Sequence, residues 1–257
     1  MTLLVGIRCS DGVVVAADRA VTLGSMEQPT ISHPACKISV LDGSVIVAGS
    51  GYTGTLQRFC DVVEDTLLNC ADCAGYQQKR PIEIGRILCT AGRKDFQSTM
   101  MKDGIFGALV AFPSVMGRGP QLCEFHEKDF QPDLKDAGTW FVSMGYGRPI
   151  ADSYLAFMRD TFWRGGMPTL AHGIFSAAWV MQQSIRVSPG FIDEPIDIAV
   201  LQGEKARMLE PRELTYHMGA VDRAMKHFGT FDPTASAPGI EQTAAVPLAP
   251  SPEPPPK

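Results

Sequence analysis

The sequence predicts an α+β fold in which two β-sheets pack face to face and pairs of helices cover their outer faces. Strand-like apolar runs open the chain and a pair of helical segments follows. Strands and then helices return in the same order before a further strand. Runs of strands that alternate with runs of helices are typical of layered α+β domains.

The first two strands are expected at residues 3–9 and 12–18, joined by Asp11-Gly12, a pair that is common in hairpin turns. Residues 19–35 contain one Gly and two Pro, so we expect an irregular excursion there. Further strands are expected at 36–41, 44–48, 104–112, 121–126, 139–144 and 196–201.

Apolar residues at three- and four-residue steps predict amphipathic helices. The clearest case runs through Leu56, Phe59, Val63 and Leu67. A second helix is expected to begin at Pro81, since proline is favoured in the first turn. Further helices are expected around 151–158, 168–181 and 211–228.

The composition changes near the end of the chain. We expect residues 1–228 to form one domain and residues 229–257, which are rich in Pro, Ala and Ser, to form a tail. Such a segment buries too little apolar surface to offset its chain entropy. The tail is therefore expected to be disordered or polyproline-like, as an inert extension or, less favoured, a docking peptide.

Composition also excludes several classes of partner. The formal net charge of -5 leaves no basic footprint for nucleic acid or an anionic membrane. No apolar run approaches the roughly 18 residues that a membrane helix requires. The chain shows no basic segment of a secretory signal, and its seven cysteines suit reduced thiols. We therefore expect a cytoplasmic protein.

Neither a metal nor a cofactor is expected. Cys70 and Cys73 form a C-x-x-C pair, but a zinc site would need a second pair of ligands at metal spacing. The histidines are scattered along the chain and are expected to be surface or packing residues: His33, His126, His172, His217 and His227.

Thr2 is the candidate nucleophile. Initiator Met is usually removed when a small residue follows it, which would leave Thr2 with a free α-amine beside its hydroxyl. A hydroxyl is a weak nucleophile and needs a base close by. Because an α-amine titrates near 7.7–8.0, a useful fraction is neutral at working pH. Thr2 could then supply both nucleophile and base.

Three further residues fit the supporting roles in type and order. Lys37, with a pKa lowered by desolvation, could help take the hydroxyl proton, and Asp18 could orient that lysine. Gly49 stands in an Ala-Gly-Ser turn whose backbone N–H could bind the developing oxyanion.

This pattern resembles the β-type proteasome subunits and the HslV-type peptidase, which are N-terminal-nucleophile hydrolases with a four-layer αββα sandwich. Thr2 matches the nucleophile, Asp18 opens the D-x-x-x-T-x-G segment, and Lys37 and Gly49 match the lysine and the oxyanion turn. The resemblance is close over residues 2–50 and points to a bacterial proteasome-like homologue. It implies a threonine-type endopeptidase.

The resemblance also implies substrate contacts and partners. Thr22 and Gly49 would hold a peptide as an added strand, and Val21, Val47 and Gly51 would line an uncharged specificity pocket. The family further implies stacked homo-oligomeric rings around an inner chamber, with peptides or unfolded proteins as substrates. A chamber implies an unfolding ATPase, which no sequence feature identifies.

The supporting residues depart from the family pattern. Tyr146 stands where a serine would lie near the amine of Thr2, and Ser188 matches a later supporting serine. No counterpart of the supporting aspartate is found. The arginine expected two residues after Asp18 is replaced by Ala20, with Arg19 one step earlier. These changes alter the expected proton-handling network and favour reduced or altered peptidase activity.

Alternatives therefore stay open. The chain could be a catalytically impaired or non-catalytic ring scaffold, like the α-type subunits, although those begin with a helical extension. It could also be an N-terminal-nucleophile amidase acting on non-peptide amides, although such relatives often begin with Cys or Ser. A module that binds peptides without turnover is a more distant alternative, motivated by Tyr146.

Overall fold

A computed structural model describes residues 2–24, 29–68, 78–101, 106–113, 117–188, 190 and 192–231; the side chains of 22–24 and 29–33 are not described. Residues 1–221 form one compact unit, and residues 222–257 form a second. The Cys70–Cys73 pair and the expected tail beyond residue 231 lie outside the described residues. The expected domain boundary at 228 stays a prediction.

Two five-stranded antiparallel sheets form the centre of the first unit. The first has the order β10-β1-β2-β11-β12 and the second the order β5-β6-β7-β8-β9. The strands of the first sheet are β1 (Leu3–Arg8), β2 (Val13–Asp18), β10 (Phe141–Gly145), β11 (Ile196–Gln202) and β12 (Lys205–Met208). Those of the second are β5 (Ile38–Leu41), β6 (Val45–Gly51), β7 (Phe106–Phe112), β8 (Gln121–Phe125) and β9 (Pro132–Leu134).

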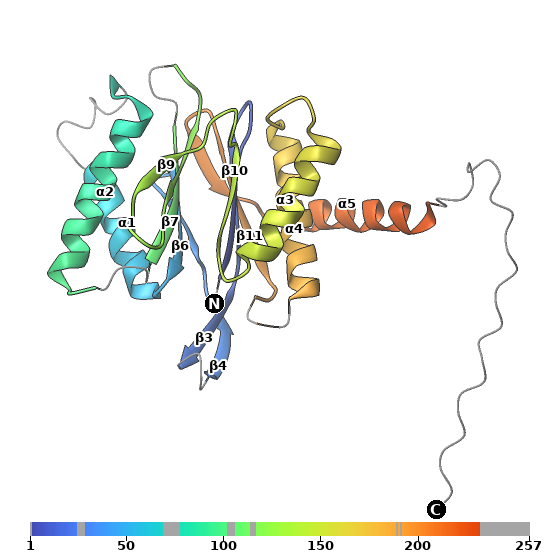
Figure 1. Ribbon diagram of the computed structural model, residues 1–257, viewed down its shortest axis with the longest axis horizontal. Coiled ribbons are helices and arrows are strands. Elements are labelled where there is room, and N and C mark those ends of the chain that lie inside the picture. The colour runs from blue at the N-terminus through green and yellow to red at the C-terminus, as the bar shows by residue number, and fades with distance from the viewer. Residues whose placement is uncertain are drawn as a thin grey trace, which may run out of the picture. The chain divides into compact units, whose positions relative to one another are not determined.

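Helix pairs cover the outer faces of both sheets (Figure 1). Helices α1 (Thr53–Leu67) and α2 (Pro81–Ser98) pack on the second sheet, and α3 (Arg148–Phe162) and α4 (Leu170–Val187) pack on the first. The predicted αββα sandwich is confirmed. A further helix, α5, spans Pro211–Thr230. None of the described helices combines the length and the apolar character needed to cross a membrane.

The layers explain the continuous apolar runs of the strands. In β6, Val45 and Val47 belong to a core cluster with residues of α1 and α2, whereas Ile46 and Ala48 belong to the core between the two sheets. Successive side chains of a strand point to opposite faces. Because both faces of this sheet are covered, every position of the run is apolar.

The structure corrects the expectation for residues 19–35. They contain β3 (Ala20–Gly24) and β4 (Pro29–Pro34), which form a two-stranded hairpin. The prolines lie at the two ends of β4, where a missing N–H interrupts the ladder least. Strands β9 and β12 were not predicted, because the segments Pro132–Leu134 and Lys205–Met208 are short and partly charged.

Phe59 should be the most sensitive position of the outer core. It is fully buried and makes edge-on ring contacts with Phe106, Phe125 and Phe130. We expect Phe59→Ala to lower the free energy of unfolding by about 3–5 kcal/mol, measured by urea unfolding. Tyr216→Ala, at a side chain that is 68% exposed, is the control and should change it by about 0.5 kcal/mol or less. A loss below about 1 kcal/mol in Phe59→Ala would contradict this account of the core.

Candidate active site

The ends of several strands bring the predicted residues together. Strand register aligns Leu3 with Gly145 and Asp18 with Ile196, so Thr2, Asp18 and the turn after β10 lie at one end of the first sheet. Lys37 directly precedes β5 of the second sheet. The site therefore forms where the two sheets meet at this end.

The carboxylate of Asp18 is the centre of the group. Its Oδ1 accepts hydrogen bonds from the backbone N–H of Leu3 and from Nζ of Lys37, both at 2.7 Å. Its Oδ2 accepts the backbone N–H of Ala20 at 3.1 Å. Two groups that share one oxygen atom must lie close together, so Asp18 holds the lysine ammonium beside the peptide that follows Thr2.

Burial shapes the charges of this pair. Asp18 has no exposed surface and Lys37 is 5% exposed. Desolvation raises the pKa of Asp18, while the charge of Lys37 and the backbone hydrogen bonds act in the opposite direction. Desolvation lowers the pKa of Lys37, against the charge and hydrogen bond of Asp18. Lys37 is thereby brought closer to the range in which an amine can accept a proton.

The turn after β10 fixes the backbone of Thr2, which is 7% exposed. The N–H of Gly147 donates to the carbonyl oxygen of Thr2 at 3.3 Å. Gly145 has a φ of +84°, and a Cβ at this position would overlap the Thr2 carbonyl and lie 3.1 Å from Oγ of Ser50. Only glycine suits this position. Tyr146 lies between these glycines with 47% of its surface exposed.

The backbone of Gly49 faces Lys37. Its N–H donates to the carbonyl oxygen of Lys37 at 3.2 Å, at the end of the β5–β6 ladder. This distance is at the long limit for such a bond. A ligand oxygen at Gly49 would therefore have to share this N–H with the Lys37 carbonyl or replace it.

The residues expected to contact substrate have different environments. Val21 is half-buried in β3, and Thr22 lies opposite Ser32 in the β3–β4 register. Val47 is fully buried in the cluster under α1 and α2 and has no surface open to a ligand. Gly51 is exposed at the end of β6.

The described contacts of Ser188 do not connect it to Thr2. Its hydroxyl donates to the carbonyl oxygen of Gly190 at 2.6 Å, and its N–H bonds to the last turn of α4. These contacts hold the end of the helix. A supporting role of Ser188 toward Thr2 stays a prediction.

Sequence reasoning missed an ion pair beside this group. Nε of Arg19 lies 3.4 Å from Oδ2 of Asp197, on β11. A sequence signal for Asp197 exists, because it is the only charged residue in the apolar run Ile196–Gln202. Ser50, the last residue of the predicted oxyanion turn, was given no role of its own, but its Oγ lies 3.1 Å from where a Cβ on Gly145 would be.

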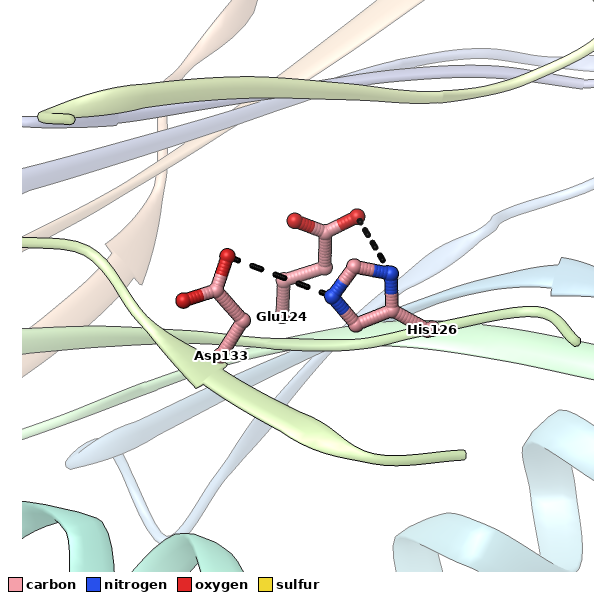
Figure 2. A group of neighbouring side chains, drawn as sticks. All are labelled: Glu124, His126 and Asp133. Atoms are coloured by element: carbon pink, nitrogen blue, oxygen red, sulfur yellow. Dashed lines mark ion pairs between the residues drawn. The ribbon is translucent and has the colours of Figure 1, made fainter. Parts of the chain in front are cut away.

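A second polar cluster lies on β8 and β9 and includes His126, which directly follows β8. Glu124, His126 and Asp133 hold ligand atoms within 4.8 Å of one another. Figure 2 shows the carboxylates of Glu124 and Asp133 facing different nitrogens of the His126 ring. Each of these two ion pairs has a nitrogen-to-oxygen distance of 3.9 Å. Nζ of Lys135 lies 2.6 Å from both carboxylates. The ammonium already supplies the positive charge there, so we assign no metal to this cluster.

The chain matches a protein-family model and short stretches of known proteins. The family model described as "Proteasome subunit" matches residues 2–156. "Proteasome subunit beta 1" of Thermococcus gammatolerans and of Thermococcus kodakarensis are each 42% identical over 55 residues, which is 21% of this chain. The match spans only about a quarter, 26%, of the length of these relatives.

Solved structures with the same fold include Anbu from Hyphomicrobium sp. strain MC1. It superposes with a TM-score of 0.63 at 13% sequence identity, over 90% of this chain and 98% of that one. The Anbu (Gly-1) mutant from the same strain gives a TM-score of 0.63 at 14% identity, over the same shares of the two chains. At these identities the likeness concerns the fold.

Replacing the central carboxylate should destabilise the protein in a pH-dependent way. Asp18→Asn leaves the buried ammonium of Lys37 without its counter-charge, so we expect a loss of about 3 kcal/mol near pH 7. The variant also loses the carboxylate that raises the pKa of Lys37. At pH values between the lowered pKa of Lys37 in the folded chain and its unfolded value of 10.5, Lys37 is neutral in the folded chain and protonated in the unfolded chain. The free energy of unfolding should therefore rise with pH through that window.

Urea unfolding followed by tryptophan fluorescence from pH 7 to pH 10 measures this effect. The variant should recover stability relative to wild type as the pH rises. Asp61→Asn, at an exposed position of α1, is the control and should follow wild type at every pH. A constant difference between Asp18→Asn and wild type would show that Lys37 does not carry the effect.

Proposed function

The chain belongs to the proteasome subunit family, and we propose that it is a threonine-type endopeptidase whose nucleophile is Thr2 after removal of Met1. The observation that carries the proposal is the shared oxygen of Asp18, which binds the N–H of Leu3 and the ammonium of Lys37 at 2.7 Å each. This bond supports a role for Lys37 beside Thr2.

In the proposed mechanism, the Thr2 hydroxyl attacks the carbonyl carbon of a peptide bond. Its proton passes to the free α-amine or to neutral Lys37, and then to the leaving amine when the C–N bond breaks. An ester between Thr2 and the acyl part of the substrate results. Water attacks this ester, releases the acid and returns the hydroxyl proton.

Gly49 would bind the oxyanion through its N–H. This requires the long 3.2 Å bond to the Lys37 carbonyl to be shared or exchanged as the substrate oxygen becomes charged. We propose that the peptide lies along the backbone of Thr22 and Gly49 as an added strand. Val21 and Gly51 would border the first specificity pocket, and buried Val47 would lie beneath it.

Support for the α-amine is the least regular part of this site. The N–H of Gly147 holds the Thr2 carbonyl, which supports a role of the 145–147 turn in orienting Thr2. Tyr146 would be the nearest hydroxyl-bearing candidate in that turn, with Ser188 as the second candidate. Their departure from the family pattern favours a slower enzyme.

Family membership also supports assembly into stacked homo-oligomeric rings in the cytoplasm, with the sites facing an inner chamber. Peptides or unfolded proteins would be the substrates, and folded proteins would need a separate unfolding ATPase. Two alternative functions predict different results in the experiment that follows. One is an impaired or non-catalytic ring scaffold, and the other is an amidase acting on non-peptide amides.

Intact mass before and after treatment with a peptide epoxyketone tests the proposal. This reagent needs both the hydroxyl and the free amine of an N-terminal Thr. We expect a mass without Met1 and a single adduct. Thr2→Ala should give no adduct, and Lys37→Ala should slow adduct formation by at least tenfold, because both amines contribute to deprotonation of the hydroxyl.

Three other results of the epoxyketone experiment would favour a different function or state of the protein. Retained Met1 would exclude the amine-assisted mechanism for the isolated chain and favour the scaffold. Processed protein without an adduct would favour an impaired site. Adduct formation without hydrolysis of any peptide in a mixed library would favour the amidase.

A further inference from the structure

Arg19 and Asp197 form an ion pair without a hydrogen bond, at the same end of the first sheet as Thr2. Nε of Arg19 and Oδ2 of Asp197 are 3.4 Å apart, and both atoms are buried without a hydrogen bond. The arginine side chain is 36% exposed and the aspartate side chain 19% exposed. Unsatisfied buried polar atoms are uncommon in folded proteins and call for an explanation.

The strand register places this pair on the face of the sheet that Thr2 shares. Ala17 is aligned with Leu4 on one side and with Asp197 on the other. Leu4 and Ala17 both point into the core between the sheets, so Asp197 projects from that same face. Thr2 precedes Leu4 by two residues and shares its face by the alternation of a strand.

The distance between strands β1 and β11 suits a bound peptide. Strands β1 and β11 flank β2, so they are two strand spacings apart, or about 10 Å. An extended peptide advances about 3.3 Å per residue. A side chain or chain end within about three residues of the bond at Thr2 could therefore reach Arg19.

The terminal nitrogens of the Arg19 guanidinium differ from those of Arg207 and Arg58 in their hydrogen bonds. Among the described residues, no acceptor is found for Nη1 or Nη2 of Arg19. In contrast, both terminal nitrogens of Arg207 donate to Glu213, and Arg58 donates through Nε and Nη2 to Asp95. Lys37 is held by Asp18 at 2.7 Å. Arg19 is thus a cation near Thr2 whose donors can meet a ligand.

We propose that Arg19 is a specificity-determining residue that binds a carboxylate of the substrate, with Asp197 as the residue that positions it. The planar fork matches a carboxylate through two parallel hydrogen bonds. Contact with Asp197 on the Nε side leaves the two terminal nitrogens to the ligand. The substrate class is therefore acidic peptides, with an Asp or Glu side chain or a C-terminal carboxylate near the cleaved bond. This inference rests on the proposed function.

A peptide series tests the proposal on the full-length protein. A neutral octapeptide with Gln at every varied position is compared with variants that carry a single Glu, and each peptide is made with a free and with an amidated C-terminus. The ratio of kcat/KM for Glu over Gln peptides is measured in wild type, Arg19→Gln, Arg19→Lys and Asp197→Asn. The control is Arg164→Gln, an exposed arginine whose Nε donates to the Asp160 carbonyl.

In wild type, Glu at one position, or the free C-terminus, should raise kcat/KM about tenfold, mainly through KM. The ratio of kcat/KM for Glu over Gln peptides should fall to about one in Arg19→Gln. In Arg19→Lys and in Asp197→Asn it should lie between one and the wild-type value. Arg164→Gln should keep the wild-type ratio. The position that responds distinguishes a side-chain carboxylate from a terminal one. No preference for acid in wild type, or the same preference in Arg19→Gln, would overturn the proposal.

A binding measurement tests the carboxylate site independently of the proposed peptidase activity. Thr2→Ala cannot form the ester, so fluorescein-labelled Glu and Gln peptides are titrated with this variant and followed by fluorescence anisotropy. We expect about tenfold tighter binding of the Glu peptide, lost when Arg19→Gln is added. If epoxyketone labelling fails but this difference is seen, the carboxylate site stands without the peptidase. Equal binding of both peptides refutes the carboxylate site whatever the activity. Thermal melting confirms that each variant is folded.

Discussion

The site depends on one buried carboxylate. Asp18 has no contact with solvent, and its two oxygens accept three hydrogen bonds from Leu3, Lys37 and Ala20. A buried carboxylate is costly unless such partners surround it. The same bonds fix the start of β1, the exit of β2 and the position of the lysine ammonium. The hydrogen bonds that satisfy Asp18 therefore also arrange the groups around Thr2, so the stability of the fold and the geometry of the candidate site rely on the same contacts.

The two sheets supply the rigidity that this arrangement needs. Asp18 belongs to the first sheet, while Lys37 leads into the second, so their 2.7 Å bond joins the sheets at the site. The core behind them is apolar and fully buried, with Leu4, Ala17, Ile46 and Ala48 facing one another across the sandwich. Close-packed interiors deform little. This packing limits the ways in which the end of the sandwich can rearrange.

Much of this architecture could be predicted from residue patterns. Continuous apolar runs identified the long strands, and helical spacing through Phe59 identified α1, so the αββα sandwich was predicted and is confirmed. The β3–β4 hairpin was not predicted, because the prolines at both ends of β4 are typical of breaks in a strand. The order of Thr2, Asp18 and Lys37 along the chain predicted part of the candidate site. The contact between Arg19 and Asp197 could not be predicted in this way. It joins residues far apart in the chain through strand register, which local spacing does not encode.

Lys37 takes part in two contacts that the proposed chemistry would use at the same time. Its side chain meets Asp18, and its carbonyl oxygen accepts the N–H of Gly49 at 3.2 Å. A substrate oxyanion drawing on that N–H would weaken the hold on the Lys37 backbone while the Lys37 amine takes part in proton transfer. The carbonyl is a neutral acceptor, whereas an oxyanion is charged and binds the same donor more strongly. Exchange of one acceptor for the other therefore favours the charged intermediate over the bound ground state, which is the condition for catalysis.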